Sequence, residues 1–196
     1  MLKEKWMDAL KHLGMGRLCH PVFCHCPVAL RLEVGEPNLP VGAAYFARAG
    51  QFVERLFHRL DACFDLLCIQ CVCLRTAERI REAAGLPVPG EIWMDGGDDE
   101  RPVLLFWSLP DRGISLRRLL GEVLYSDFGG CSQLASAVFL LDSRSELLVH
   151  LYDDRGVDLA AVRADQLKGI YQEFGSRILP GDRERIDRIF QPGEQS

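Results

Sequence analysis

The feature that most constrains this fold is a short apolar run that ends abruptly in polar residues. Residues 147–152 read Leu-Leu-Val-His-Leu-Tyr, and Asp153, Asp154, Arg155 and Gly156 follow directly. A short run of this kind is typical of a buried strand, and a glycine gives the backbone freedom to leave the sheet sharply. The sequence therefore predicts that a core strand ends at the start of a candidate polar site.

The composition is that of an ordinary globular protein. The chain has 196 residues, of which 48% are hydrophobic and 26% charged, so we expect one domain over residues 1–196. The net charge of -5 and the pI near 5.6 argue against a general nucleic-acid binder. Charged residues interrupt positions 1–13, and apolar runs stay short of the ~20 residues that cross a bilayer. We therefore expect a cytoplasmic protein with no membrane contact.

Eight cysteines raise the question of disulfides or a metal. Disulfide scaffolds are short, secreted and poor in core, so reduced thiols are the better expectation here. Soft ligands for zinc gather in one segment, at Cys19, His20, Cys24, His25 and Cys26. Their spacing does not match a standard zinc hook, which favours unligated thiols and leaves zinc as an alternative. The prediction is no metal and no cofactor.

Hydrophobic periodicity predicts an α+β fold, with helices packed on one mixed, largely antiparallel sheet of about five strands. The strands are expected at residues 28–34, 64–74, 101–109, 135–141 and 147–152. The helices are expected at residues 3–13, 44–62, 77–84, 116–124 and 167–174, and after an N-cap at Asp182. The stretch 87–100 is rich in Gly, Pro and Asp and predicts a surface loop, and residues 191–196 form a polar tail.

Several short motifs are spread over most of the chain. They are Leu30–Gly35, Trp93 with Asp95, Tyr152–Gly156 with Asp158, and Asp182–Arg183 with Ile186–Asp187. In these motifs, between about Val28 and Phe190, the chain resembles a bacterial family catalogued as domain of unknown function 3885. It departs from that family's pattern at Arg177, where an aromatic residue is usual, and in its cysteine-rich segments. The resemblance implies a bacterial protein without a known activity, of a kind often suspected to act as an immunity or antitoxin partner.

The polar turn suggests a catalytic alternative. Carboxylates at a strand end can hold a hard divalent cation, which predicts a metal-dependent hydrolase or phosphoryl-transfer enzyme. The candidate residues are Asp153, Asp154, Asp158 and Glu33, with Arg31 and Arg155 stabilising charge. Adjacent side chains of an extended strand point to opposite faces, so the first two aspartates are not expected to converge on one ion. The architectural interpretation is that one aspartate accepts backbone N–H groups while Arg155 pairs with the other or with Glu33.

A protein-binding module is the leading interpretation of the sequence, with an enzyme less favoured. No coherent catalytic set stands out in the sequence, and His150 reads as an ordinary strand histidine. Trp93 is a large aromatic residue in an expected loop, next to an acidic cluster of Asp95, Asp98 and Asp99. Such a cluster can meet a basic partner, so we expect protein contacts there.

Overall fold

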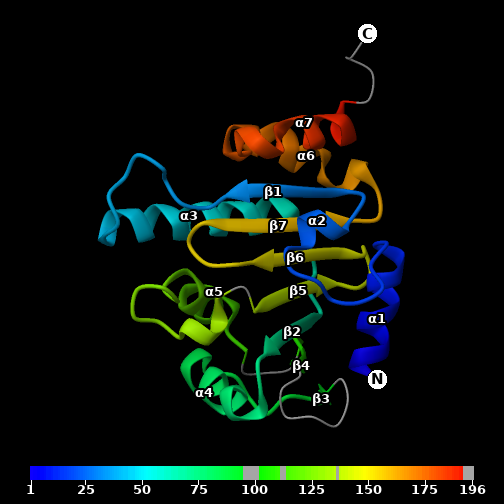
Figure 1. Cartoon of the computed structure of the whole chain (residues 1–196), viewed down its shortest axis with the longest axis vertical. Coiled ribbons are helices and arrows are strands. Elements are labelled where there is room, and N and C mark those ends of the chain that lie inside the picture. The colour runs from blue at the N-terminus through cyan, green and yellow to red at the C-terminus, as the bar shows by residue number, and fades with distance from the viewer. Residues whose placement is uncertain (95–101, 111–113, 136, 192–196) are drawn as a thin grey trace.

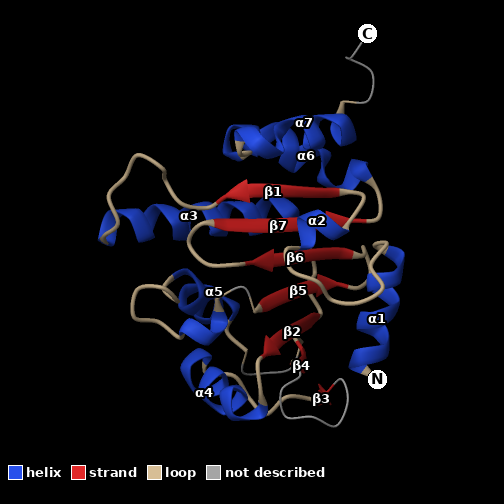
Figure 2. Ribbon diagram, in the orientation of Figure 1, coloured by secondary structure: helices blue, strands red, loops and turns tan. Residues whose placement is uncertain are grey.

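The computed structural model describes residues 1–94, 102–110, 114–135 and 137–191. The predicted contact residues Asp95, Asp98 and Asp99, and most of the predicted polar tail, lie outside these ranges. The described part combines one sheet with helices on both sides of it (Figures 1 and 2). None of the described helices is both long enough and apolar enough to span a bilayer.

The sheet confirms the predicted α+β class, but the prediction of about five strands is wrong. Seven strands pair in the order β1-β7-β6-β5-β2-β4-β3, and every pair between described strands is antiparallel. The strands are β1 Ala29–Glu33, β2 Leu66–Cys71, β3 Glu91–Met94, β4 Val103–Ser108, β5 Val138–Asp142, β6 Leu147–Leu151 and β7 Gly156–Ala161.

The two strands that the prediction missed are β3 and β7. Strand β3 lies within the stretch expected to be a loop, because it is only four residues long and its neighbours are turn-forming residues. Among the described strands it lies at the edge of the sheet and pairs only with β4. Strand β7 carries a buried aspartate, Asp158, a residue type that strands usually avoid. Strand β3 is held in the sheet by β4, and β7 is held both by its neighbour β6 and by β1, which is distant in the sequence.

The main helices lie close to their predicted ranges. They are α1 Leu2–His12, α3 Ala43–Leu60, α4 Leu74–Ala84, α5 Leu116–Leu124, α6 Ala164–Phe174 and α7 Pro180–Phe190. The one-turn helix α2 Val22–His25 was not predicted. Three helices begin clearly earlier than predicted, and the first of them is α6, which begins at Ala164 and not at residue 167. Helix α4 begins earlier, because Cys73 is its N-cap and Thr76 bonds back to the Cys73 backbone from the first turn. Helix α7 begins at Pro180, a residue tolerated at the first helical position, and Asp182 lies in its first turn instead of at its cap.

Helices cover both faces of the sheet's middle, which explains why β5, β6 and β7 are buried throughout. Figure 1 shows α2 on one side of β7 and α3 on the other, with α6 and α7 beyond β1. Residues paired across antiparallel strands share a face. On the face with α1 and α2, one such row runs across six strands through Arg31, Asp158, His150, Phe139, Cys68 and Phe106. Trp6 of α1 packs near the last ring of the row, with centroids 6.0 Å apart.

Candidate functional site

The turn between β6 and β7 holds the first candidate aspartate in place. Asp153 is fully buried and accepts hydrogen bonds from the Arg155 backbone N–H at 2.7 Å and from the Arg155 Nε at 2.8 Å. The side chain of this aspartate therefore closes the turn on itself. Arg155 pairs with this same aspartate, and not with Asp154 or Glu33 as the sequence had suggested. The neighbouring carboxylate raises the pKa of the arginine.

The second aspartate is fastened to α3. The Tyr45 hydroxyl donates a hydrogen bond to the Asp154 carboxylate at 2.6 Å, and both residues are buried. Burial and the aspartate together raise the pKa of the tyrosine, so its hydroxyl remains a donor at neutral pH. Gly35, just after β1, makes room for this contact: a Cβ there would lie 2.1 Å from the tyrosine hydroxyl oxygen.

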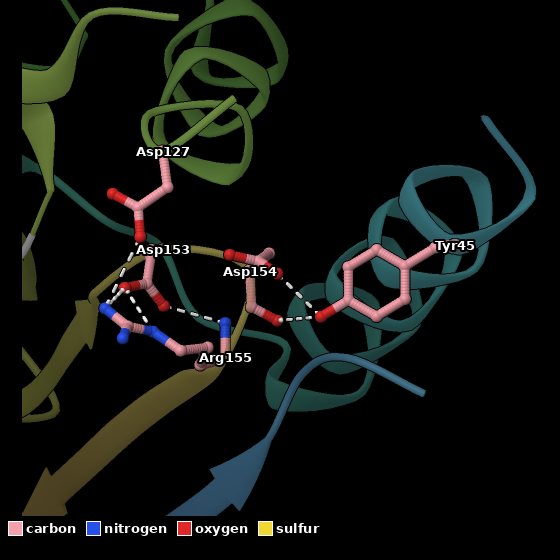
Figure 3. A network of polar contacts seen from close by, with 5 residues as sticks. All are labelled: Tyr45, Asp127, Asp153, Asp154 and Arg155. Atoms are coloured by element: carbon pink, nitrogen blue, oxygen red, sulfur yellow. Dashed lines mark hydrogen bonds and ion pairs between the residues drawn. The ribbon is translucent and has the colours of Figure 1, made fainter. Parts of the chain in front are cut away.

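A third carboxylate joins the turn from the segment after α5. One carboxylate oxygen from each of Asp127, Asp153 and Asp154 lies within 4.8 Å of those of the other two. Arg155 also approaches Asp127, with Nη2 and Oδ2 3.6 Å apart (Figure 3). The prediction that the two adjacent aspartates would not converge is therefore wrong. Both residues lie beyond the end of β6, where strand alternation no longer applies.

The chemistry of this cluster is limited by its own partners. Three carboxylates suit a hard divalent cation such as Mg²⁺ or Mn²⁺. Here, however, Arg155 already compensates Asp153, and Tyr45 already donates to Asp154. Asp127 is the exposed member of the trio. The arrangement is therefore a satisfied polar junction that joins the turn to α3 and to the segment after α5.

The other sequence candidates form a separate group under α2. Asp158 is fully buried in β7 and accepts a hydrogen bond from Arg31 Nε at 2.9 Å and from the Phe23 backbone N–H at 2.7 Å. Burial alone would lower the pKa of Arg31, but the aspartate raises it. Glu33 is half-buried and pairs in register with Gly156. The six candidates therefore do not form one site.

The cysteine and histidine segment folds over this second group. His20 lies edge-on to His150 and Tyr152, with centroids 5.2 and 5.8 Å away, and the buried His150 stacks on Phe139 at 4.1 Å. Burial, followed by the charge of Asp158, raises the pKa of the Cys26 thiol to about 12. Within the described ranges, Asp127, Asp153 and Asp154 are the residues whose ligand atoms lie close enough together for one metal ion. The described residues of the cysteine and histidine segment form no such group. The sequence indicated His20 only as a candidate zinc ligand and not as a neighbour of His150.

An apolar groove runs between α3 and α5. Its volume is about 400 Å³, and its apolar lining is Phe46, Val53, Phe57, Leu116, Leu120 and Leu124, with Tyr125 at its end. Phe46 stacks on Tyr125 with centroids 4.2 Å apart and meets Phe128 edge-on at 5.1 Å. Tyr125 and Phe128 are 45% and 49% exposed, and Asp127 of the polar junction lies between them in sequence. This groove was not predicted from the sequence.

Trp93 is half-buried on β3, and the Lys3 Nζ of α1 lies 4.3 Å from the centroid of its ring. Its neighbours on the strand, Ile92 and Met94, are 49% and 51% exposed. Trp93 therefore packs toward α1, while two apolar side chains of the same edge strand face solvent.

Comparison with known proteins gives one match. The sequence model of a family described as Domain of unknown function (DUF3885) matches residues 7–182. The chain belongs to this family. The DUF3885 match begins before the expected start at Val28 and ends before the Ile186–Asp187 pair. No curated protein and no solved structure matches the chain.

Proposed function

We propose that this chain is a protein-binding module that receives its partner in the groove between α3 and α5. One observation carries the proposal: the apolar groove ends beside two large, exposed aromatic side chains, Tyr125 and Phe128. Clustered exposed apolar surface on a globular protein often marks an interaction site. Tyrosine is enriched among the residues that dominate binding energy at interfaces, and aromatic residues in general are enriched there.

The polar junction supports the proposal by fixing both walls of the groove. Asp154 holds Tyr45, which precedes the groove residue Phe46 on α3. On the other side, Arg155 pairs with Asp127 in the turn that carries the exposed aromatics. The Tyr-Asp-Asp-Arg-Gly motif then positions the binding surface without supplying most of it.

The partner is best described by the chemistry of the groove. Its lining is apolar, while Glu54 and Arg117 form an ion pair at its rim with Oε1 and Nε 3.5 Å apart. A groove of this kind between two helices suits the apolar face of an amphipathic helix. An immunity- or antitoxin-type role is one form of this proposal, in which the helix belongs to a toxin.

The proposal can be tested with two matched double variants. Tyr125→Ser with Phe128→Ser removes the exposed aromatics, and Ile92→Ser with Met94→Ser removes equally exposed side chains on β3. Each protein is immobilised and exposed to a lysate of the source organism, and each captured protein is purified for direct binding measurements. We expect the unaltered chain and the β3 variant to bind the same partner and the aromatic variant to lose it. Equal binding by all three proteins would rule out the groove, and loss in the β3 variant alone would move the contact to the region of Trp93.

A metal-dependent hydrolase or phosphoryl-transfer enzyme is the second candidate, favoured by the convergence of three carboxylates within 4.8 Å. A divalent ion there would have to displace Arg155 from Asp153. Titration calorimetry with MnCl₂, using Asp127→Asn as the matched variant, tests this function directly. Heat of binding that disappears in the variant would support it, and the absence of heat in the unaltered chain would remove it.

A further inference from the structure

We propose that two adjoining cavities around His20 form a binding site for a small aromatic molecule that carries an anionic group. The cavities have volumes of about 510 and 360 Å³, and both are lined by Leu18, His20, Gln70 and Pro102. Their sizes fall in the usual range of small-molecule pockets, ~300–1,000 Å³. Neither cavity shares a lining residue with the groove between α3 and α5, so this site is independent of the proposed protein contact.

The charge of the lining selects the class of ligand. The smaller cavity is lined by Arg17, His20 and His25, and no described carboxylate side chain lines either cavity. This local excess of cationic and ionisable nitrogen groups contrasts with the net charge of -5 of the whole chain. Arginine and histidine donate to phosphate and carboxylate oxygens, so an anionic group fits this lining better than a cation does.

The uncharged lining indicates what the anionic group is attached to. The smaller cavity also contains Trp93 and Leu104, which suit an aromatic ring. The larger cavity offers neutral hydrogen-bonding side chains from Thr76, Ser132 and Gln133. A ligand that spans both cavities would therefore place its anionic group and its ring near Arg17, and a neutral polar extension beside Gln133.

His20 lies where the two cavities meet, and its ring is supported from the sheet side. It contacts the rings of His150 and Tyr152 edge-on, at 5.2 and 5.8 Å between centroids, and His150 in turn stacks on Phe139. A side chain held in place before the ligand arrives loses less conformational freedom on binding. This support makes the exposed imidazole a preorganised contact.

The test compares three probes of similar size by calorimetry: phenyl phosphate, phenylacetate and benzylammonium. Inorganic phosphate serves as a fourth probe that lacks the ring. We expect phenyl phosphate or phenylacetate to bind and benzylammonium not to bind. The anion with the higher affinity identifies the natural head group. Inorganic phosphate should bind at least about tenfold more weakly than phenyl phosphate, since it makes no apolar contact.

Variants locate the binding. Arg17→Ala and His20→Ala should each lower the affinity for the tighter-binding anion by about tenfold, the equivalent of ~1.4 kcal/mol. The matched controls are Arg48→Ala and His58→Ala, which change exposed residues on α3 outside both cavities and should bind as the unaltered chain does. Thermal unfolding of each variant confirms that it is folded. Equal or stronger binding of benzylammonium, no binding of either aromatic anion at millimolar concentration, or equal losses in the control variants would overturn the proposal.

Discussion

The hydroxyl of Tyr45 donates a hydrogen bond to the carboxylate of Asp154 across a separation of 109 positions in the sequence, with the two oxygens 2.6 Å apart. This contact joins the first turn of α3 to the turn between β6 and β7. Asp154 is only 4% exposed, so water does not readily replace the hydroxyl. Its hydrogen-bonding requirement links two parts of the chain that no local pattern connects.

The first prediction concerns this bond. Tyr45→Phe leaves the buried Asp154 carboxylate without its hydroxyl donor and should lower the free energy of unfolding by about 1–3 kcal/mol. Urea denaturation at pH 7 measures the change. Tyr125→Phe is the matched control, because that residue is 45% exposed and the loss of its hydroxyl should change stability by less than about 0.5 kcal/mol. If the two variants lost the same free energy of unfolding within error, the assigned role of the bond would be contradicted.

The second prediction concerns the buried ion pair on the other face of the sheet. Arg31→Ala removes the cationic partner of Asp158, which is 0% exposed, and leaves it the hydrogen bond from the Phe23 N–H. The substitution should lower the free energy of unfolding by about 3–5 kcal/mol. Denaturant unfolding of the single variants and of Arg31→Ala with Asp158→Asn forms a double-mutant cycle. The double variant should be less destabilised than the sum of the two single variants. Additive losses would show that the two residues act independently.

The third prediction is a pH dependence at Asp65. Burial would raise the pKa of this carboxylate, but Lys5 and the backbone and hydroxyl of Ser143 outweigh burial and lower it. A folded-state pKa below the unfolded value gives stability that is present above about pH 4 and is lost as the pH falls through the folded pKa.

Asp65→Asn should therefore reduce the free energy of unfolding by about 1 kcal/mol at pH 7, with the difference from the unaltered chain shrinking toward pH 3. Urea denaturation at both pH values measures it. Asp8→Asn is the control, since Asp8 forms an exposed ion pair on the same helix as Lys5. A difference that grows as the pH falls would contradict the sign derived for Asp65.

The fourth prediction concerns thiol reactivity. Backbone N–H groups of Thr76 and Arg75 at the start of α4 lower the pKa of Cys73. More of this thiol is therefore present as thiolate at pH 7, and the thiolate is the reactive form. Iodoacetamide should modify Cys73 several-fold faster than Cys24 or Cys63, both of which are more exposed, as measured by peptide mass spectrometry. Equal rates at the three cysteines would show that exposure alone governs their reactivity.

The long elements of the fold were predictable because their signals are local. Helix α3 has apolar residues at helical spacing, and β6 is a short continuous apolar run. Each pattern can be recognised from neighbouring residues alone. Strand β3 carries no such signal, since it is four residues long and belongs to the sheet through β4. Strand β7 was obscured by Asp158, which is acceptable in the core only because Arg31 reaches it from β1.

The candidate site was predictable only in part, for a related reason. Asp153 and Asp154 stand out in the sequence because they directly follow an apolar strand. Their partners Tyr45 and Asp127 come from a helix and from a turn that are distant in the chain. His20 belongs with His150 only because the segment before α2 folds across the sheet. Tertiary contacts of this kind leave no periodic pattern in the sequence.

The residues of the β6–β7 turn that hold the walls of the groove are not the residues that line it. The bonds of this turn run from Asp154 to Tyr45 and from Arg155 to Asp127, and its carboxylates are buried. The spacing of the two helices is thus set at one end, by residues that a bound helix would barely touch. Side chains along the groove can then change in size or polarity while the walls keep their distance. If the groove binds a partner as proposed, a few substitutions on α3 and α5 would adapt it to a new one and leave the architecture intact.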